Sequence, residues 1–356
     1  MKLALAQARK NLGKTKENPT VGCVIAKNNS LISVGGTSIG GRPHGEQNAI
    51  MFSRTNLKDS DMYVTLEPCS HYGQTLPCTK SIINKRVKKV FFSVNDPDVR
   101  SFDRSKLFFK QANIIVKKGI YTKEVENFYR SYFKSKKCLL PFVSCKLAIS
   151  KDFFTKNKKK KWITNFFSRS RGHLLRSYHD CIMTSSKTII SDNSRLTCRI
   201  DGLKDTSPSR IVLDNKLKIS LKSKVIKDST KFRTIIFYNK FDKKKINQLK
   251  RLKVELYKIS LDENCNLDLD QVLLKAKNLG FYRILLESGI RLVSNFLYKN
   301  LIDDFYLFVS NKNLGKNGKY NIKKNLKFFL KNKKSLNEKV NLFGDKLVIY
   351  KINKYV

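Results

Sequence analysis

Residues 65–78 read TLEPCSHYGQTLPC, and a short way upstream residues 43–46 read PHGE. These two stretches contain one histidine and two cysteines, His44, Cys69 and Cys78, each directly after a proline. A catalytic zinc ion is typically held by three nitrogen or sulfur ligands, with a fourth position left for water. The residues therefore predict a zinc site formed by His44, Cys69 and Cys78.

Glu46 follows His44 by two residues, at the start of a helix that the sequence predicts over residues 45–54. A carboxylate there can reach a water molecule on the metal without binding the metal itself. Zinc lowers the pKa of such a water to about 7, and Glu46 can then accept its proton and pass it to a leaving amine. The combination of H-x-E with P-C is the signature of zinc-dependent nucleobase deaminases, so Glu46 is the predicted catalytic residue.

Two further residues near these motifs need an interpretation. His71, two residues after Cys69, is a competing ligand, although contact with substrate or with a loop carbonyl suits it better. A fourth protein ligand such as His71 would instead indicate a structural zinc site. Cys23 lies in an apolar segment and is expected in the core.

Helix and strand signals alternate along the chain, which indicates an α/β layered fold. In the first part we expect strands at residues 20–26, 31–35, 61–66, 90–94 and 114–116, and helices at residues 1–11, 45–54, 78–86, 102–111 and 122–136. In the second part we expect strands at residues 142–149, 181–184, 210–213, 234–238, 283–286 and 305–309, and helices at residues 165–177, 269–278 and 292–299. Residues 311–334 are polar and basic, and are expected to form a solvated loop with short strands. The boundary between two domains is expected near residues 137–140.

Length, cysteine usage and charge narrow the classes of function. The 356 residues suit two domains, and no stretch reaches the roughly 18 uncharged apolar residues of a membrane span. The eight cysteines show no regular disulfide spacing, and no signal peptide precedes the first motif, so the expected location is the cytoplasm. The formal charge of +45 is also a feature of nucleic-acid-binding proteins, but the lysines are spread over the whole chain without an aromatic–arginine face. We therefore expect neither a nucleic acid nor a membrane as partner, and the sequence leaves a homo-oligomer open.

Three motifs together resemble the bifunctional riboflavin-biosynthesis deaminase–reductase family: residues 18–25 (NPTVGCVI), residues 44–46 (HGE) and residues 65–78. Many cytidine, adenosine and tRNA deaminases space their cysteines as P-C-x-x-C, whereas eight residues separate Cys69 from Cys78, as in the riboflavin family. The resemblance implies a cytidine-deaminase-like three-layer domain over residues 1–138 and a dihydrofolate-reductase-like α/β domain over residues 139–356. It also implies the cofactors Zn²⁺ and NADPH, and a phosphorylated small-molecule substrate, a diaminopyrimidinone that carries a ribosylamino 5′-phosphate.

Scattered segments of the second half resemble the reductase domain of the family. By this resemblance, cofactor contacts fall on Ala148, Trp162, Thr188, Asp192, Asn215 and Gly289, and substrate contacts fall on Arg176, Leu196, Arg199 and Glu287. Arg176 is expected to bind the substrate phosphate, since a guanidinium binds phosphate through two parallel hydrogen bonds. In the first half, the resemblance places Asn18 in the pocket for the pyrimidine base.

Three departures from the family pattern bear on activity. Gly45 stands where the family usually has alanine, Phe153 stands where it has glycine, and the glycine-rich segment of the family is Glu287-Ser288-Gly289 here. Because the last two departures narrow the cofactor site, a monofunctional deaminase with a decayed reductase domain is one alternative. The other is a zinc deaminase acting on RNA or tRNA, which the charge favours and the spacing of the cysteines opposes.

Overall fold

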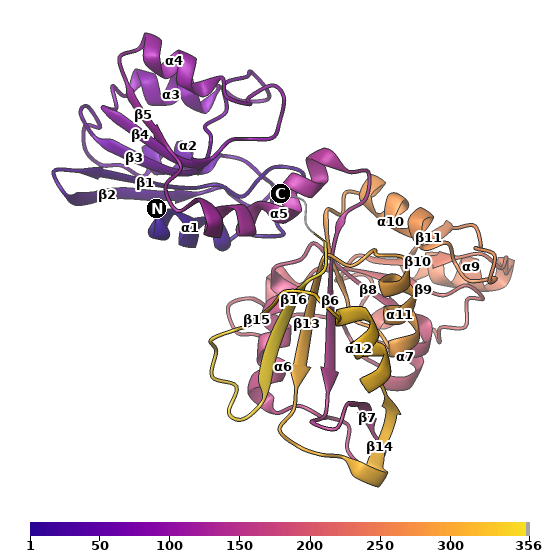
Figure 1. Ribbon diagram of the computed structural model, residues 1–356. Coiled ribbons are helices and arrows are strands. Elements are labelled where there is room, and N and C mark those ends of the chain that lie inside the picture. The colour runs from indigo at the N-terminus through magenta and orange to yellow at the C-terminus, as the bar shows by residue number, and fades with distance from the viewer. Residues whose placement is uncertain (354–356) are drawn as a thin grey trace. The chain divides into compact units, whose positions relative to one another are not determined.

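The computed structural model describes residues 1–353. The chain divides after Cys138 into two compact units, an N-terminal unit, Met1–Cys138, and a C-terminal unit that begins at Leu139 (Figure 1). Each unit is described by itself.

A five-stranded sheet with strand order β2-β1-β3-β4-β5 forms the centre of the N-terminal unit (Figure 1). The strands are β1 (Gly22–Lys27), β2 (Ser30–Gly36), β3 (Asp61–Leu66), β4 (Lys89–Val94) and β5 (Ile115–Lys118). β1 runs antiparallel to β2 and β3, whereas β3, β4 and β5 are parallel. The helices are α1 (Lys2–Arg9), α2 (Gly45–Met51), α3 (Cys78–Asn84), α4 (Ser105–Gln111) and α5 (Thr122–Lys137).

Glycines in β1 and β2 allow helices to pack closely on both faces of this sheet. A methyl group at Gly22 would lie 1.8 Å from the Ala4 carbonyl oxygen in α1, and one at Gly35 would lie 2.4 Å from the Ala49 amide nitrogen in α2. Gly35 pairs with Cys23, the chain neighbour of Gly22, so the two glycines face opposite sides of the sheet. The sheet therefore lies between α1 and α2, and the predicted three-layer α/β fold is confirmed.

A nine-stranded sheet with strand order β11-β10-β9-β8-β12-β6-β13-β16-β15 organises the C-terminal unit. The strands are β6 (Phe142–Ile149), β8 (Cys181–Ser185), β9 (Ser209–Leu213), β10 (Thr234–Tyr238), β11 (Glu255–Lys258), β12 (Arg283–Leu286), β13 (Asp304–Val309), β15 (Ser335–Asn337) and β16 (Lys346–Lys351). From β11 to β13 neighbouring strands are parallel, whereas β16 and β15 continue the sheet in antiparallel fashion. A separate pair consists of β7 (Phe154–Asn157) and β14 (Gly318–Asn321).

Helices cover this larger sheet on both faces. They are α6 (Phe166–Ser177), α7 (Ser186–Asp192), α8 (Lys224–Lys227), α9 (Lys243–Arg251), α10 (Leu269–Asn278), α11 (Ile290–Tyr298) and α12 (Lys323–Leu330), with the 3₁₀ turns η1 (Lys204–Thr206) and η2 (Gly315–Asn317). On β12, Ile284 and Leu286 belong to one apolar core and Leu285 to the other, which explains the unbroken apolar sequence of a parallel strand buried on both faces. The carboxyl ends of the parallel strands share one edge of the sheet, so the turns after β8, β9 and β12 gather there.

The prediction for residues 311–334 was wrong in part, because this segment contains the helix α12 as well as the short strand β14. Ile322 and Leu326 are only 1% and 6% exposed and belong to the core. Exposed lysines stand between them in the sequence, so the apolar spacing was masked by the local charge. Seven further elements were not predicted from the sequence: α7, α8, α9, β7, β11, β15 and β16.

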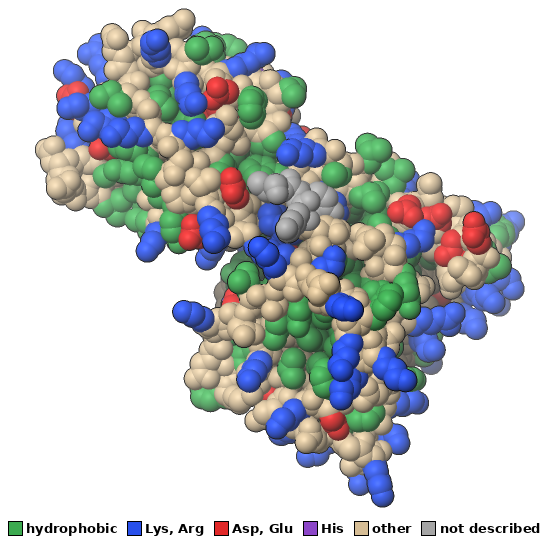
Figure 2. All heavy atoms as spheres, viewed as in Figure 1, with side chains coloured by type: hydrophobic (Ala, Val, Ile, Leu, Met, Phe, Trp, Pro, Cys, Tyr) green, Lys and Arg blue, Asp and Glu red, His purple; other side chains and the backbone are tan. Residues whose placement is uncertain are grey.

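The basic side chains do not gather at one place on the visible surface. Figure 2 shows Lys and Arg spread over each unit, with few acidic side chains among them. Within residues 1–353, no helix combines the length and the apolar character that a membrane span requires.

Candidate functional site

The three predicted zinc ligands lie together in the N-terminal unit. His44 precedes α2, Cys69 lies in the loop after β3, and Cys78 is the first residue of α3. The Nδ1 atom of His44 is 3.6 Å from the Sγ atom of Cys69 and 3.4 Å from that of Cys78, and the ligand atoms all lie within 4.8 Å of one another. The arrangement offers one nitrogen and two sulfurs at one point, a donor set that suits zinc.

Two buried side-chain atoms at this cluster bear on whether it fits a metal ion. Glu46 is 2% exposed, and within residues 1–353 neither its Oε2 atom nor the Nε2 atom of His44 has a hydrogen-bond partner. Buried polar groups are normally hydrogen-bonded, so an orphaned carboxylate oxygen beside three metal-binding side chains fits a site for a metal and a water molecule. Burial raises the pKa of Glu46 to about 7.

The two cysteines are in close contact with each other. The amide of Cys78 donates to the Sγ atom of Cys69 at 3.3 Å. Hydrogen bonding with Cys78 lowers the pKa of Cys69, while the same contact and burial raise the pKa of Cys78. A divalent cation at this point would favour the thiolate form of both.

His71 is not among the residues that converge on the site. Its Nδ1 atom lies 2.8 Å from the Oγ atom of Ser101, and the residues that the structure describes supply only His44, Cys69 and Cys78 to the cluster. Three protein side chains at one point match the ligand number of a catalytic zinc centre, whereas a structural zinc site usually has four protein ligands. Cys23 is fully buried in the core, as predicted.

Asn18 contacts the segment that precedes His44, and Gly45 follows His44 directly. The Nδ2 atom of Asn18 donates to the Gly41 carbonyl at 3.4 Å, and this ties Asn18 to the segment that leads into His44. A methyl group at Gly45 would lie 2.3 Å from the Val21 carbonyl oxygen. Gly45 therefore lets α2 pack closely against the chain before β1.

In the C-terminal unit, Arg176 and Glu287 form a nearly buried ion pair. Arg176 Nε donates to Glu287 Oε1 at 2.7 Å and Nη2 donates to Oε2 at 2.9 Å, and both side chains are 13% exposed. Arg176 Nη1 also donates to the Thr197 carbonyl at 2.9 Å. Arg176, the predicted phosphate ligand, is thus already bound to Glu287, another predicted substrate residue, and the neighbouring Arg199 is exposed.

Three hydroxyl groups meet where β8 and β12 end. The side-chain oxygens of Ser185, Thr188 and Ser288 lie 3.0 to 3.1 Å from one another, and the Gly289 amide is 3.3 Å from the Thr188 hydroxyl. Of these residues, Thr188 and Gly289 were predicted cofactor contacts. Ser288, a departure from the glycine-rich pattern, is a full member of this hydroxyl cluster.

The other predicted residues of this unit occupy several places. Ala148 lies on β6 and pairs with Phe308 on β13. Leu196 is buried and has φ at 57°. Asp192 is exposed at the end of α7, and Asn215 donates to the Cys265 carbonyl at 3.2 Å. Trp162 is 52% exposed and lies against Lys161 and Arg169. The structure thus brings Arg176 together with Glu287, with Arg199 close enough to interact electrostatically with both, and it brings Thr188 together with Gly289.

Two further residues of this unit, Lys146 and Phe153, bear on the predicted substrate and cofactor sites. Lys146 interacts electrostatically with Glu287 and Arg176, and burial lowers its pKa; the signal that could have singled it out is a lysine inside the apolar strand β6. Phe153 has φ at 70°, in the left-handed region that favours glycine. The backbone at Phe153 therefore has a conformation that a glycine would adopt without strain.

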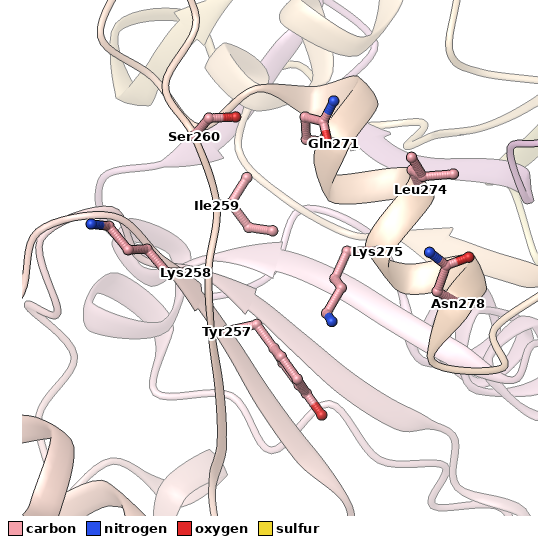
Figure 3. A pocket seen from close by; sticks show the side chains of 8 residues that line it. All are labelled: Tyr257, Lys258, Ile259, Ser260, Gln271, Leu274, Lys275 and Asn278. Atoms are coloured by element: carbon pink, nitrogen blue, oxygen red, sulfur yellow. The ribbon is translucent and has the colours of Figure 1, made fainter.

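A separate pocket lies between β11 and α10 in the C-terminal unit (Figure 3). It has a volume of about 250 Å³ and is lined by Tyr257, Lys258, Ile259, Ser260, Gln271, Leu274, Lys275 and Asn278. The Lys275 ammonium lies 4.5 Å from the centre of the Tyr257 ring. None of the predicted site residues lines this pocket.

The fold and the metal cluster define a zinc-dependent deaminase joined to a dihydrofolate-reductase-like unit. Residues 1–94 match the family model for the cytidine and deoxycytidylate deaminase zinc-binding region, and residues 141–340 match the model for the RibD C-terminal domain. The chain belongs to the RibD family, and it is an enzyme of riboflavin biosynthesis with a deaminase and a reductase domain.

Relatives match over nearly the whole length. The chain is 31% identical to the riboflavin biosynthesis protein RibD of Actinobacillus pleuropneumoniae, over 88% of this chain and 84% of the relative. It is also 31% identical to RibD of Buchnera aphidicola, over 95% of this chain and 91% of the relative. Among solved structures, RibD of Acinetobacter baumannii superposes with a TM-score of 0.83 at 26% identity, over 99% of this chain and 98% of that one. The deaminase/reductase of Thermotoga maritima gives a TM-score of 0.82 at 27% identity, over 99% and 97% of the two chains.

Proposed function

We propose that the N-terminal unit removes ammonia from a diaminopyrimidinone that carries a ribosylamino 5′-phosphate, and that the C-terminal unit then reduces the ribosyl group to a ribityl chain with NADPH. The observation that carries the first step is the convergence of His44, Cys69 and Cys78 beside the orphaned carboxylate of Glu46. In this proposal the three side chains hold zinc and Glu46 moves the proton.

The deamination needs a proton to travel from water to the departing nitrogen. Zinc at the cluster would make water acidic enough to give up a proton near neutral pH. Glu46 accepts that proton at its free Oε2 atom and delivers it to the amine, while the oxygen bonds to the ring carbon and the carbon–nitrogen bond breaks to release ammonia. Asn18, held beside the segment that leads to His44, orients the pyrimidine base.

The reduction takes place in our proposal at the carboxyl edge of the larger sheet. The hydroxyl cluster of Ser185, Thr188 and Ser288, with the Gly289 amide, supplies donors for a phosphate of NADPH. Ala148, Trp162, Asp192 and Asn215 are proposed as further cofactor contacts. Preference for NADPH rests on family membership.

In our proposal the substrate of the reduction binds at the same carboxyl ends of the strands, on the side opposite the hydroxyl cluster. Arg199 offers an exposed guanidinium to the phosphate, Arg176 orients Glu287 toward the sugar, and Leu196 packs against the substrate. Hydride passes from the nicotinamide to the first ribose carbon, the bond from that carbon to the ring oxygen breaks, and the oxygen takes up a proton. The assembled pair of Arg176 and Glu287 supports a working reductase over a decayed one.

The distribution of basic side chains and the state of the cysteines bear on the partners and the cellular location of the protein. We propose that the chain acts on a small molecule and binds no nucleic acid, because its basic residues are distributed along the whole sequence and are spread over the face that Figure 2 shows. All eight cysteines are free thiols, which suits the reducing cytoplasm. A homo-oligomer is compatible with this function.

The variant Glu46→Gln tests the proposed deamination. It preserves the shape of the side chain but cannot carry the proton, so we expect ammonia release from the diaminopyrimidinone substrate to fall by about 10²–10⁴-fold. Zinc content, measured on the same sample by elemental analysis, is expected to stay at the wild-type level. Ammonia release at the wild-type rate would refute the role of Glu46, and loss of zinc in parallel with activity would make Glu46 a structural residue instead.

A further inference from the structure

Glu67 is a buried carboxylate that the proposed reactions leave without a role. It lies two residues before the proposed zinc ligand Cys69 and is 2% exposed. Its Oε1 atom accepts hydrogen bonds from the amide and the hydroxyl of Ser105, at 3.1 and 2.8 Å. Its Oε2 atom accepts from the amides of Asp103 at 3.0 Å and Asp96 at 3.4 Å. One carboxylate thus organises the segment between β4 and α4.

The other side of Cys69 is attached to the same segment. His71, two residues after Cys69, lies 2.8 Å through Nδ1 from the hydroxyl of Ser101, and Ser101 is fully buried. Cys69 itself belongs to neither a helix nor a strand. It is therefore flanked by two side chains, Glu67 and His71, that both bind residues 96–105. We name these two side chains, Glu67 and His71, together with their contacts to residues 96–105, the clamp.

We infer that the clamp holds Cys69 at the place where it binds the metal, and that Glu67 is a positioning residue of the zinc site. This inference rests on the proposed zinc role of His44, Cys69 and Cys78. Residues that do not bind the metal but orient its ligands typically contribute 10–100-fold to metal affinity, and this is lost when they are mutated. The four hydrogen bonds to Glu67 make it the stronger anchor, and the single contact of His71 the weaker one.

The variant Glu67→Gln tests the clamp. Three of the four groups that face the carboxylate oxygens are backbone amides, which can only donate, so the NH₂ group of glutamine faces at least one amide donor whichever way it is turned. We expect zinc release to a chromogenic chelator to become at least about 10-fold faster. We also expect the visible absorption of the cobalt-substituted protein to change, because its bands report the geometry of the thiolate ligands. Ser101→Ala, which removes the weaker anchor, is expected to accelerate zinc release to a smaller extent.

The matched control is Ser93→Ala in β4. Ser93 is fully buried and donates to the Ile120 carbonyl at 2.7 Å, so its loss destabilises the same unit without touching the clamp. Zinc release and a cobalt spectrum in Glu67→Gln equal to those of Ser93→Ala would overturn the inference. If Glu67→Gln does not fold, Ser105→Ala removes one of the four hydrogen bonds, and faster release than in Ser93→Ala is again required. A wild-type chain that binds no zinc would overturn the metal site itself, an outcome distinct from equal release rates in the variants.

Discussion

The ion pair of Arg176 and Glu287 shows how single residues balance charge inside the C-terminal unit. Burial alone would raise the pKa of Glu287, but Arg176 outweighs it and lowers that pKa to about 2. Two parallel hydrogen bonds join the side chains, and such bidentate pairs are the strong ones. Removal of one partner leaves the other charge buried and uncompensated, whereas replacement of both by apolar residues removes that cost.

Glu287→Ala is therefore expected to lower the free energy of unfolding of the C-terminal unit by about 3–5 kcal/mol, measured by urea denaturation. The double variant Arg176→Met with Glu287→Leu is expected to recover most of this loss and still to lack NADPH oxidation. The control is Asp201→Ala, which breaks the exposed pair of Lys204 and Asp201, whose carboxylate is 94% exposed, and is expected to leave the free energy of unfolding near the wild-type value. A Glu287→Ala variant as stable as Asp201→Ala would contradict this account of the pair.

The residues that could be predicted from the sequence are those whose chemistry is local. His44, Cys69 and Cys78 each follow a proline, and Glu46 is in register with His44, so the cluster was evident before the fold was known. Arg176 and Glu287 are 111 positions apart, and no local signal predicts that the expected phosphate ligand is bound to a carboxylate. The anchoring role of Glu67 was missed for the same reason, because its four donors lie 29 to 38 positions further along the chain.

At the scale of elements, the strands and helices with clear apolar spacing were predicted and the charged ones were not. α9, with sequence KKKINQLKR, buries only Ile246 and Leu249, and α12 buries Leu326 among lysines. In such elements two or three buried positions decide the packing, while the sequence average is polar. Residues 102–104, predicted as the start of a helix, instead precede α4, because Glu67 binds the amides of Asp103 and Ser105.

Contacts between elements also create pH dependence. His179 is 2% exposed and joins α6 to β6: its Nδ1 atom lies 2.6 Å from the Leu175 carbonyl and its Nε2 atom lies 2.8 Å from the Ser144 hydroxyl. A carbonyl only accepts, so Nδ1 carries the proton and Nε2 accepts from the hydroxyl. Burial lowers the pKa of His179 to about 3, and the ring therefore stays neutral in the folded protein.

This arrangement predicts a loss of stability in mild acid. The unfolded histidine, with a pKa of about 6.5, binds a proton below that pH while the folded one does not until about pH 3. The contribution of the neutral His179 to the free energy of unfolding is thus fully present above pH 6.5, and it falls as the pH decreases toward 3. Between pH 7 and pH 5.5 the wild type is expected to lose about 1 kcal/mol more unfolding free energy than His179→Asn. Identical pH profiles of the two proteins, by urea denaturation, would argue against a neutral buried His179.

At the scale of the whole molecule, the chain carries two chemistries in two separately built units. The N-terminal unit places a metal cluster where α2, α3 and the loop after β3 meet, and the C-terminal unit places hydroxyls and a charged pair at the carboxyl edge of a parallel sheet. The order of the units follows the order of the proposed reactions, deamination before reduction. Each unit has its own core, so the loss of one activity need not remove the other.

The most direct measurement follows ammonia release and NADPH oxidation together in the zinc-loaded protein. With the diaminopyrimidinone ribosylamino phosphate, we predict equal molar amounts of ammonia released and NADPH oxidised. Glu46→Gln is predicted to lose both signals with this substrate, and to oxidise NADPH at the wild-type rate when given the deaminated compound, 5-amino-6-(5-phosphoribosylamino)uracil. Ammonia release without NADPH oxidation in the wild type would contradict the claim that both units are active in this chain.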